Sequence, residues 1–128
     1  MARKRGRPRP YNVILRVHDS NTSNLRETIV TPAKSKRVRI IRVKALQQDV
    51  SAGRRQFGLY FGTGVDITTD PTKAIDVLDI PDLGEATTRT YLRGEGPRGL
   101  RSEVLSGQWQ ATPPGVSHSI LVEYEEDP

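Results

Sequence analysis

The sequence predicts an all-β domain, an antiparallel β-sandwich or jelly-roll-like fold, preceded by a disordered or extended basic N-terminal arm. Three observations predict it: apolar and polar residues alternate in several short stretches, turn-forming residues separate most of these stretches, and helical periodicity is scarce. The 128 residues leave room for one domain. We therefore divide the chain into an arm over residues 1–10 and a sandwich domain over residues 11–128.

Period-two alternation predicts three half-buried strands, each with one face toward the core and one toward solvent. The residues expected on the inward faces are Tyr11, Val13, Leu15 and Val17 in the first strand, Phe57, Leu59 and Phe61 in the second, and Ile120, Val122 and Tyr124 in the third. In the stretch KRVRIIRVKAL, the apolar positions change face between Ile40 and Ile41. That change indicates a β-bulge or a strand buried on both faces.

Shorter strands are expected in RETIVT (26–31), AIDVLDI (74–80), TRTYL (88–92) and EVLSGQWQA (103–111). The stretch DLGEATTR (82–89) is the one place where a single helical turn is expected. Seven or eight short strands result, and alternation alone fixes their faces but not their pairing. A small sandwich leaves strand edges exposed, and we expect a homo-oligomer that covers some of them.

The net charge of +5 comes from the arm. The arm has five basic residues and no acid, and the remaining 15 basic and 15 acidic residues balance; the five are Arg3, Lys4, Arg5, Arg7 and Arg9. Inside the domain, basic residues gather between positions 34 and 55 and acids between 65 and 85 and near the C-terminus. Either neighbouring strands neutralise one another within the monomer, or opposite charges meet between subunits.

The arm contains Arg5-Gly6-Arg7-Pro8, which resembles the core of an AT-hook, a motif that lies in the minor groove of A·T-rich DNA. Glycine allows close approach, proline keeps the chain extended, and arginines suit the narrow, electronegative groove. The alternative is a basic arm that contacts an acidic neighbour or any polyanion. In both cases the five basic residues supply salt-sensitive affinity.

The sequence indicates no catalytic site, metal site or cofactor site. The chain has no cysteine, and GEGPRG (94–99) lacks the βαβ context that a dinucleotide site needs. The two histidines, His18 and His118, have no metal-ligand spacing with Asp19 or Glu123. Ser119 follows His118 directly, but adjacent strand residues point to opposite faces. We predict a protein that is not an enzyme and has no cofactor.

Two further features bear on partners. Trp109 is the single tryptophan, and in a strand before a Pro-Pro turn it is typical of a core or of a subunit interface. A sugar-stacking role for Trp109 needs companions that the sequence does not identify. No apolar segment is long enough to cross a membrane as a helix, so no membrane partner is expected.

The order of motifs in residues 28–126 is similar to that of small β-sandwich structural proteins encoded among the virion genes of tailed bacteriophages. The motifs are TIVTPAKSKRVRIIRVKAL, FGLYFGTG, LRGEGPRGLRSEVL and HSILVEYEE, with an acidic stretch between the second and third. The resemblance implies a virion component, most typically a capsid decoration (cement) protein or a head or tail accessory protein. It also implies a symmetric oligomer, a trimer foremost, and the major capsid protein or other virion subunits as partners.

The arm lies outside this resemblance, so two other functions stay open. One is a DNA-binding accessory protein that uses the AT-hook-like arm. The other is a small tail or receptor-binding module on the same fold.

Overall fold

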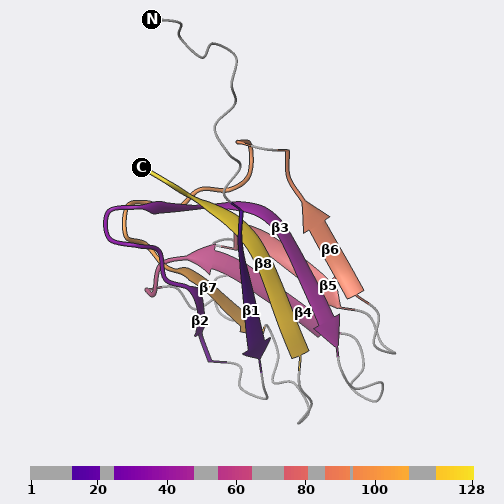
Figure 1. The fold of residues 1–128 in the computed structure, drawn as a ribbon. Helices are drawn as coiled ribbons and strands as arrows, with labels where there is room; N and C mark the ends of the chain where they lie inside the picture. The colour runs from indigo at the N-terminus through magenta and orange to yellow at the C-terminus, as the bar shows by residue number, and fades with distance from the viewer. Residues whose placement is uncertain are drawn as a thin grey trace, which may run out of the picture.

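The computed structural model describes residues 13–20, 25–47, 55–64, 74–80, 86–92, 94–109 and 118–128. These form eight strands and two four-stranded sheets (Figure 1). The strands are β1 (Ile14–Ser20), β2 (Glu27–Val30), β3 (Arg37–Gln47), β4 (Arg55–Phe61), β5 (Asp76–Ile80), β6 (Ala86–Thr90), β7 (Leu105–Trp109) and β8 (His118–Asp127). The predicted all-β fold is confirmed.

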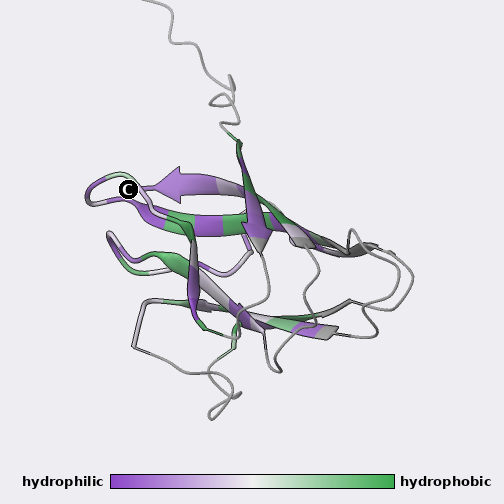
Figure 2. Ribbon diagram, turned by 90° about the horizontal axis from the view of Figure 1, so that it is seen from below, coloured by the Kyte–Doolittle hydropathy of each residue, from purple (hydrophilic) through white to green (hydrophobic). Residues whose placement is uncertain are grey.

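The strand order explains how the chain builds its two layers. The first sheet has the order β1-β8-β3-β6 and the second β2-β7-β4-β5, and Figure 2 shows them as separate layers. Strands β1, β2, β3 and β4 pair antiparallel with β8, β7, β6 and β5, respectively. This is the pairing of a long hairpin rolled into a double sheet, which makes the sandwich jelly-roll-like.

The core lies between the sheets, where the inward residues of both meet. At its centre Phe57 and Trp109 pack edge to face, with ring centroids 4.8 Å apart, an arrangement that aromatic pairs favour. Other fully buried side chains are Ile29, Ile40, Leu59, Leu78, Leu105 and Ile120. The inward positions expected in β4 and β8 are therefore confirmed for Phe57, Leu59, Ile120, Val122 and Tyr124.

The change of face in β3 is a β-bulge, as the sequence indicates. Ile40 pairs with Tyr124 of β8, and the next pair is Arg42 with Glu123, so Ile41 is the extra residue. The bulge lets Val38 and Ile40 before it and Val43 and Ala45 after it all face the core. One long strand thus contributes apolar side chains along its whole length.

Two expectations of local structure are wrong. Residues 86–89, assigned to a helical turn, belong to β6, which ends at Thr90, before the expected Tyr91 and Leu92. In β1 the expected inward face points out: Leu15 and Val17 are 56% and 50% exposed. The reason is register, because Arg16 and His18 pair with the inward-facing Val122 and Ile120 of β8, and neighbouring paired residues share a face.

Candidate interaction site

The sandwich has two lateral sides, and polar contacts close one of them. There the edge strand β6 of one sheet lies beside the edge strand β5 of the other. Arg89 Nε lies 3.1 Å from Asp76 Oδ2, and the Tyr91 hydroxyl donates a hydrogen bond to the same carboxylate. The Asp76 side chain is only 10% exposed and that of Arg89 is 52% exposed, so a nearly buried carboxylate with a half-exposed partner closes this side of the core.

The opposite side, between the edge strands β1 and β2, is more open. His18 and Glu27 join the two edges, with Nε2 and Oε1 3.2 Å apart. Next to this contact lies a pocket of about 260 Å³ lined by Arg16, Thr28, Ile29, Val30, Thr31 and Tyr124. The pocket therefore combines an apolar wall with a guanidinium group and hydroxyl-bearing side chains.

Tyr124 connects this pocket to the core. The residue is 6% exposed, and burial is the main cause that raises the pKa of its phenol; Glu126 adds to the rise and Arg16 opposes it. The phenol is therefore neutral at physiological pH and presents a hydroxyl group, not a negative charge, to the pocket.

Exposed apolar side chains gather on β1. Val13, Ile14, Leu15 and Val17 are all among the exposed large hydrophobic residues of the described chain. Leu15 and Val17 pair with Glu123 and Leu121 of β8, so they lie on the outer surface of the first sheet. A contiguous apolar row on an edge strand marks an interaction surface or an aggregation hazard.

The basic and acidic strands neutralise one another within the monomer. Arg39 Nε lies 2.7 Å from Asp127 Oδ2, and Arg42 pairs with Glu123, both across the β3–β8 pair. Of the two alternatives left open by the charge pattern, neighbouring strands within one chain account for these pairs.

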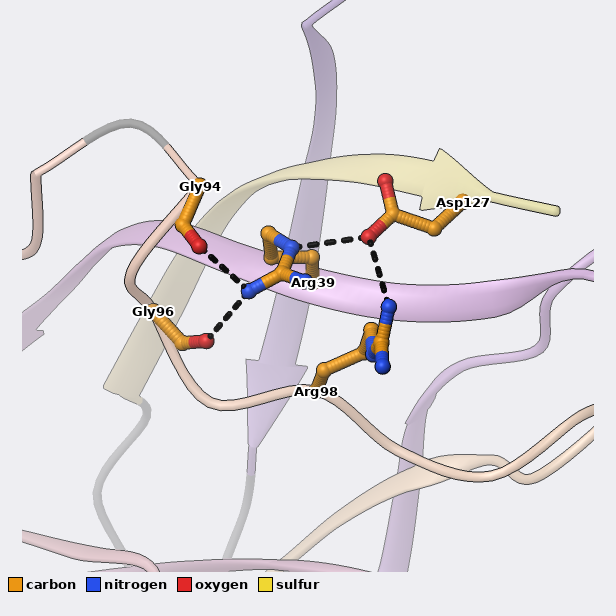
Figure 3. Close-up of polar contacts among 5 residues, drawn as sticks. All are labelled: Arg39, Gly94, Gly96, Arg98 and Asp127. Atoms are coloured by element: carbon orange, nitrogen blue, oxygen red, sulfur yellow. Dashed lines mark hydrogen bonds and ion pairs between the residues drawn. The ribbon is translucent and has the colours of Figure 1, made fainter.

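Arg39 also holds the GEGPRG loop in place (Figure 3). Its Nη1 donates to the carbonyl oxygens of Gly94 and Gly96 at 2.7 and 3.1 Å, and Arg98 approaches the same Asp127 carboxylate at 3.8 Å. The loop backbone continues the sheet, because Ile40 N donates to Pro97 O and Gly99 N to Val38 O. The loop is thus an edge cover for β3.

The close packing of this loop requires glycine. A Cβ atom at Gly96 would lie 1.8 Å from the carbonyl oxygen of Ile40. Backbone packing against β3 thus explains the glycine at position 96 of the motif.

The structure tests the other residues singled out in the sequence only in part. Arg3, Lys4, Arg5, Arg7 and Arg9 lie outside the described residues. Trp109 has no exposed surface, so it belongs to the core. Neither face of its ring is exposed for contact with another subunit or for stacking against a sugar. The His18 ring contacts the Glu27 carboxylate. In the described ranges no group of three or more potential ligands is placed to hold a metal ion.

The open β1–β2 side has no signal in the sequence. The apolar alternation of β1 is that of a half-buried strand, and only its pairing with β8 shows that the row faces outward. Among the described residues no helix is long and apolar enough to cross a membrane.

Comparisons with known proteins bear on the fold. No family model matches the chain, and no curated protein matches it by sequence. A chain from the acidic stable capsid structure of Helicobacter pylori bacteriophage KHP30 has a similar fold, with a TM-score of 0.58, 14% identity, and coverage of 88% of this chain and 86% of that chain. At this identity the likeness concerns the fold.

Two more distant likenesses are a chain of the cyanophage Pam1 capsid asymmetric unit and a chain of Bacillus endospore appendages, which form a family of disulfide-linked pili. The first has a TM-score of 0.43 at 11% identity and covers 99% of this chain and 94% of that chain. The second has a TM-score of 0.45 at 11% identity and covers 88% and 86%.

Proposed function

We propose that this protein is a non-enzymatic structural component of a tailed-phage virion, a capsid decoration protein that binds neighbouring capsid subunits. The observation that carries the proposal is the eight-strand double sheet, whose fold is similar over 88% of the chain to a chain in a phage capsid structure. The motif order along residues 28–126 supports the same class. The proposed location is therefore the virion.

Attachment uses the arm and the open β1 side. The side at β5 and β6 is sealed by Asp76 and Arg89. On the outer face of β3 and β8, Arg39 pairs with Asp127 and Arg42 with Glu123. The β1 edge, in contrast, offers exposed apolar side chains. The arm precedes this same edge in the chain, and its five basic residues suit an acidic capsid surface, on which a basic segment can order as it binds. Symmetric copies multiply such weak interactions.

The experiment is to measure occupancy of the protein on purified phage capsids by quantitative mass spectrometry. We expect the intact protein to bind and a variant lacking residues 1–10 to bind at reduced occupancy with unchanged folding. A variant with all five arm cations changed to glutamine separates loss of charge from loss of length. Absence of the protein from purified virions would overturn the virion assignment, and unchanged occupancy of the truncated variant would overturn the role of the arm.

A DNA-binding accessory protein is the second candidate, favoured by Arg5-Gly6-Arg7-Pro8 in the arm. In that case Arg5 and Arg7 read A·T-rich minor groove, and their joint replacement abolishes A·T preference. The domain itself, with balanced charge outside the arm, contributes little to such binding.

A further inference from the structure

The four edge strands of the sandwich differ in how they are protected from pairing with other chains. The edges are β1 and β6 in one sheet and β2 and β5 in the other. Strand β2 has four residues and a register shift next to Ile29. Strand β5 carries acids at both Asp76 and Asp79, and β6 consists of polar residues after Ala86. Short length, bulges and charges are the devices by which natural edges avoid association.

Strand β1 has neither short length nor a bulge, and its charged residues Arg16 and Asp19 are the devices that it does carry. It has seven residues without proline or glycine, and its pairing with β8 runs without a shift from Ile14 to Ser20. Its outward side chains Leu15 and Val17 are half exposed and apolar, and the preceding Val13 is exposed as well. In the described part of the chain, β1 is therefore the edge best suited to accept another strand.

We propose that β1 pairs antiparallel with β1 of a second copy of this chain, around a two-fold axis at Leu15. In this register Leu15 lies opposite its own copy, and Val13 lies opposite Val17 of the second copy. The three outward apolar side chains of each strand thereby form one continuous row across the pair. On the inner face Ile14 lies opposite Arg16 of the second copy, where the methylene groups of arginine contact the isoleucine.

Neighbouring registers are less favourable. An axis at Arg16 places two guanidinium groups directly opposite each other, and like charges in that position destabilise a strand pair. An axis at Val17 places Leu15 opposite Asp19 and leaves an apolar side chain facing a carboxylate. The register at Leu15 has neither defect, so the sequence of β1 is self-complementary in the way an isologous interface requires.

The absence of cysteine makes a cross-linking test direct. Opposed residues in an antiparallel pair have Cα atoms about 4.5–5.5 Å apart, which is within disulfide range. Leu15→Cys therefore forms a disulfide dimer under mild oxidation. Val17→Cys does not, because the two copies of residue 17 lie about 13 Å apart, four residues along the strand.

Solution mass provides the second measurement. We expect sedimentation equilibrium to give twice the 14.3 kDa chain mass for the intact protein. Leu15→Glu places two carboxylates at the axis and weakens dimerisation by more than about tenfold. Leu92→Glu, the same change at a 73% exposed leucine in a loop, leaves the mass unchanged, and circular dichroism verifies that both variants are folded.

Three outcomes overturn the pairing: a monomer at all concentrations, a trimer that persists in Leu15→Glu, or equal cross-linking of the two cysteine variants. A monomer whose β1 amides become protected from exchange only on capsids also overturns it and assigns the edge to a capsid strand instead. The inference rests on the proposed function for the oligomer. It assigns the backbone edge of β1 to the second copy and leaves the arm and the outward apolar row for attachment to the capsid. Because the test needs no virion, its failure is distinguishable from failure of the capsid proposal.

Discussion

The carboxylate of Asp76 and the guanidinium of Arg89, with Nε and Oδ2 3.1 Å apart, join the edge of one sheet to the edge of the other. The Tyr91 hydroxyl donates to the same carboxylate. This cluster closes one lateral side of the sandwich, whereas the β1–β2 side is more open. The open side is the one that we propose as the surface for partners.

Asp76→Ala is expected to lower the free energy of unfolding by about 1–3 kcal/mol, because Arg89 and Tyr91 lose their shared acceptor in a largely buried position. Urea denaturation measures the change. The matched control is Glu123→Ala, which removes a carboxylate that is 26% exposed, against 10% for Asp76, and should cost no more than about 1 kcal/mol. Equal losses in the two variants would show that the Asp76 cluster is no more than a surface ion pair.

The raised pKa of Tyr91 predicts that the free energy of unfolding falls at alkaline pH. Burial and then the hydrogen bond and charge of Asp76 raise the pKa of Tyr91 above its ordinary 10.0, against a smaller lowering by Arg89. The unfolded chain therefore gives up this proton at lower pH than the folded chain, and stability falls as the pH rises above 10.

Tyr91→Phe should flatten this alkaline decline, as measured by urea midpoints at pH 8 and at pH 11. Part of the decline should remain, because the pKa of Tyr124 is raised as well. At pH 8 the variant should lose about 1 kcal/mol with the hydrogen bond. A decline identical to that of the intact protein would remove Tyr91 as its source.

Trp109→Ala should destabilise the domain by about 3–5 kcal/mol, since it removes a fully buried aromatic side chain and leaves a cavity beside Phe57. Thermal and urea unfolding measure the loss. Leu92→Ala, at an exposed site, should stay within about 0.5 kcal/mol. A near-neutral Trp109→Ala would contradict its place in the core.

Gly96→Ala should destabilise the domain by about 1–3 kcal/mol, because the added methyl group overlaps the backbone of Ile40 and the loop must move off β3. The control is Gly64→Ala, where a Cβ atom meets nothing within 4 Å and little change is expected. Loss of hydrogen-exchange protection at the Ile40 and Gly99 amides would locate the damage in the loop contact.

The arm is tested by fluorescence anisotropy with A·T-rich and G·C-rich duplexes over a series of salt concentrations. As an electrostatic tether, it should bind both duplexes equally, with a slope of log affinity against log salt no steeper than about −4.5 for five cations. A preference for A·T-rich DNA that survives moderate salt would move the AT-hook alternative ahead.

Alternation predicted the strands well where a strand lies between two others, as β4 and β8 do, because only one phase places Phe57, Leu59, Ile120 and Val122 in the core. The bulge at Ile41 was also predictable, since the apolar pattern changes face there. The outward direction of Leu15 and Val17 was not. The face of an edge strand depends on its register with its single neighbour, and that register is a tertiary property.

The sealed side escaped prediction for a related reason. Asp76 and Arg89 lie on different sheets, and nothing local shows that β5 and β6 become adjacent edges. The sequence shows that the loop at Gly96 lacks the surroundings of a dinucleotide site, but its role as a cover for β3 depends on the hydrogen bonds that Pro97 and Gly99 make with β3.

The position of β8 between β1 and β3 has a consequence for how the chain reaches this state. Ile14 pairs with Tyr124, so β1 is synthesised more than a hundred residues before the strand with which it pairs. Pairings this distant in sequence slow folding and prolong exposure of incomplete sheets. Until β8 is made, no neighbouring strand fixes the face on which the apolar residues of β1 lie. The proposed pairing of β1 with β1 of a second copy can therefore form only between completed chains.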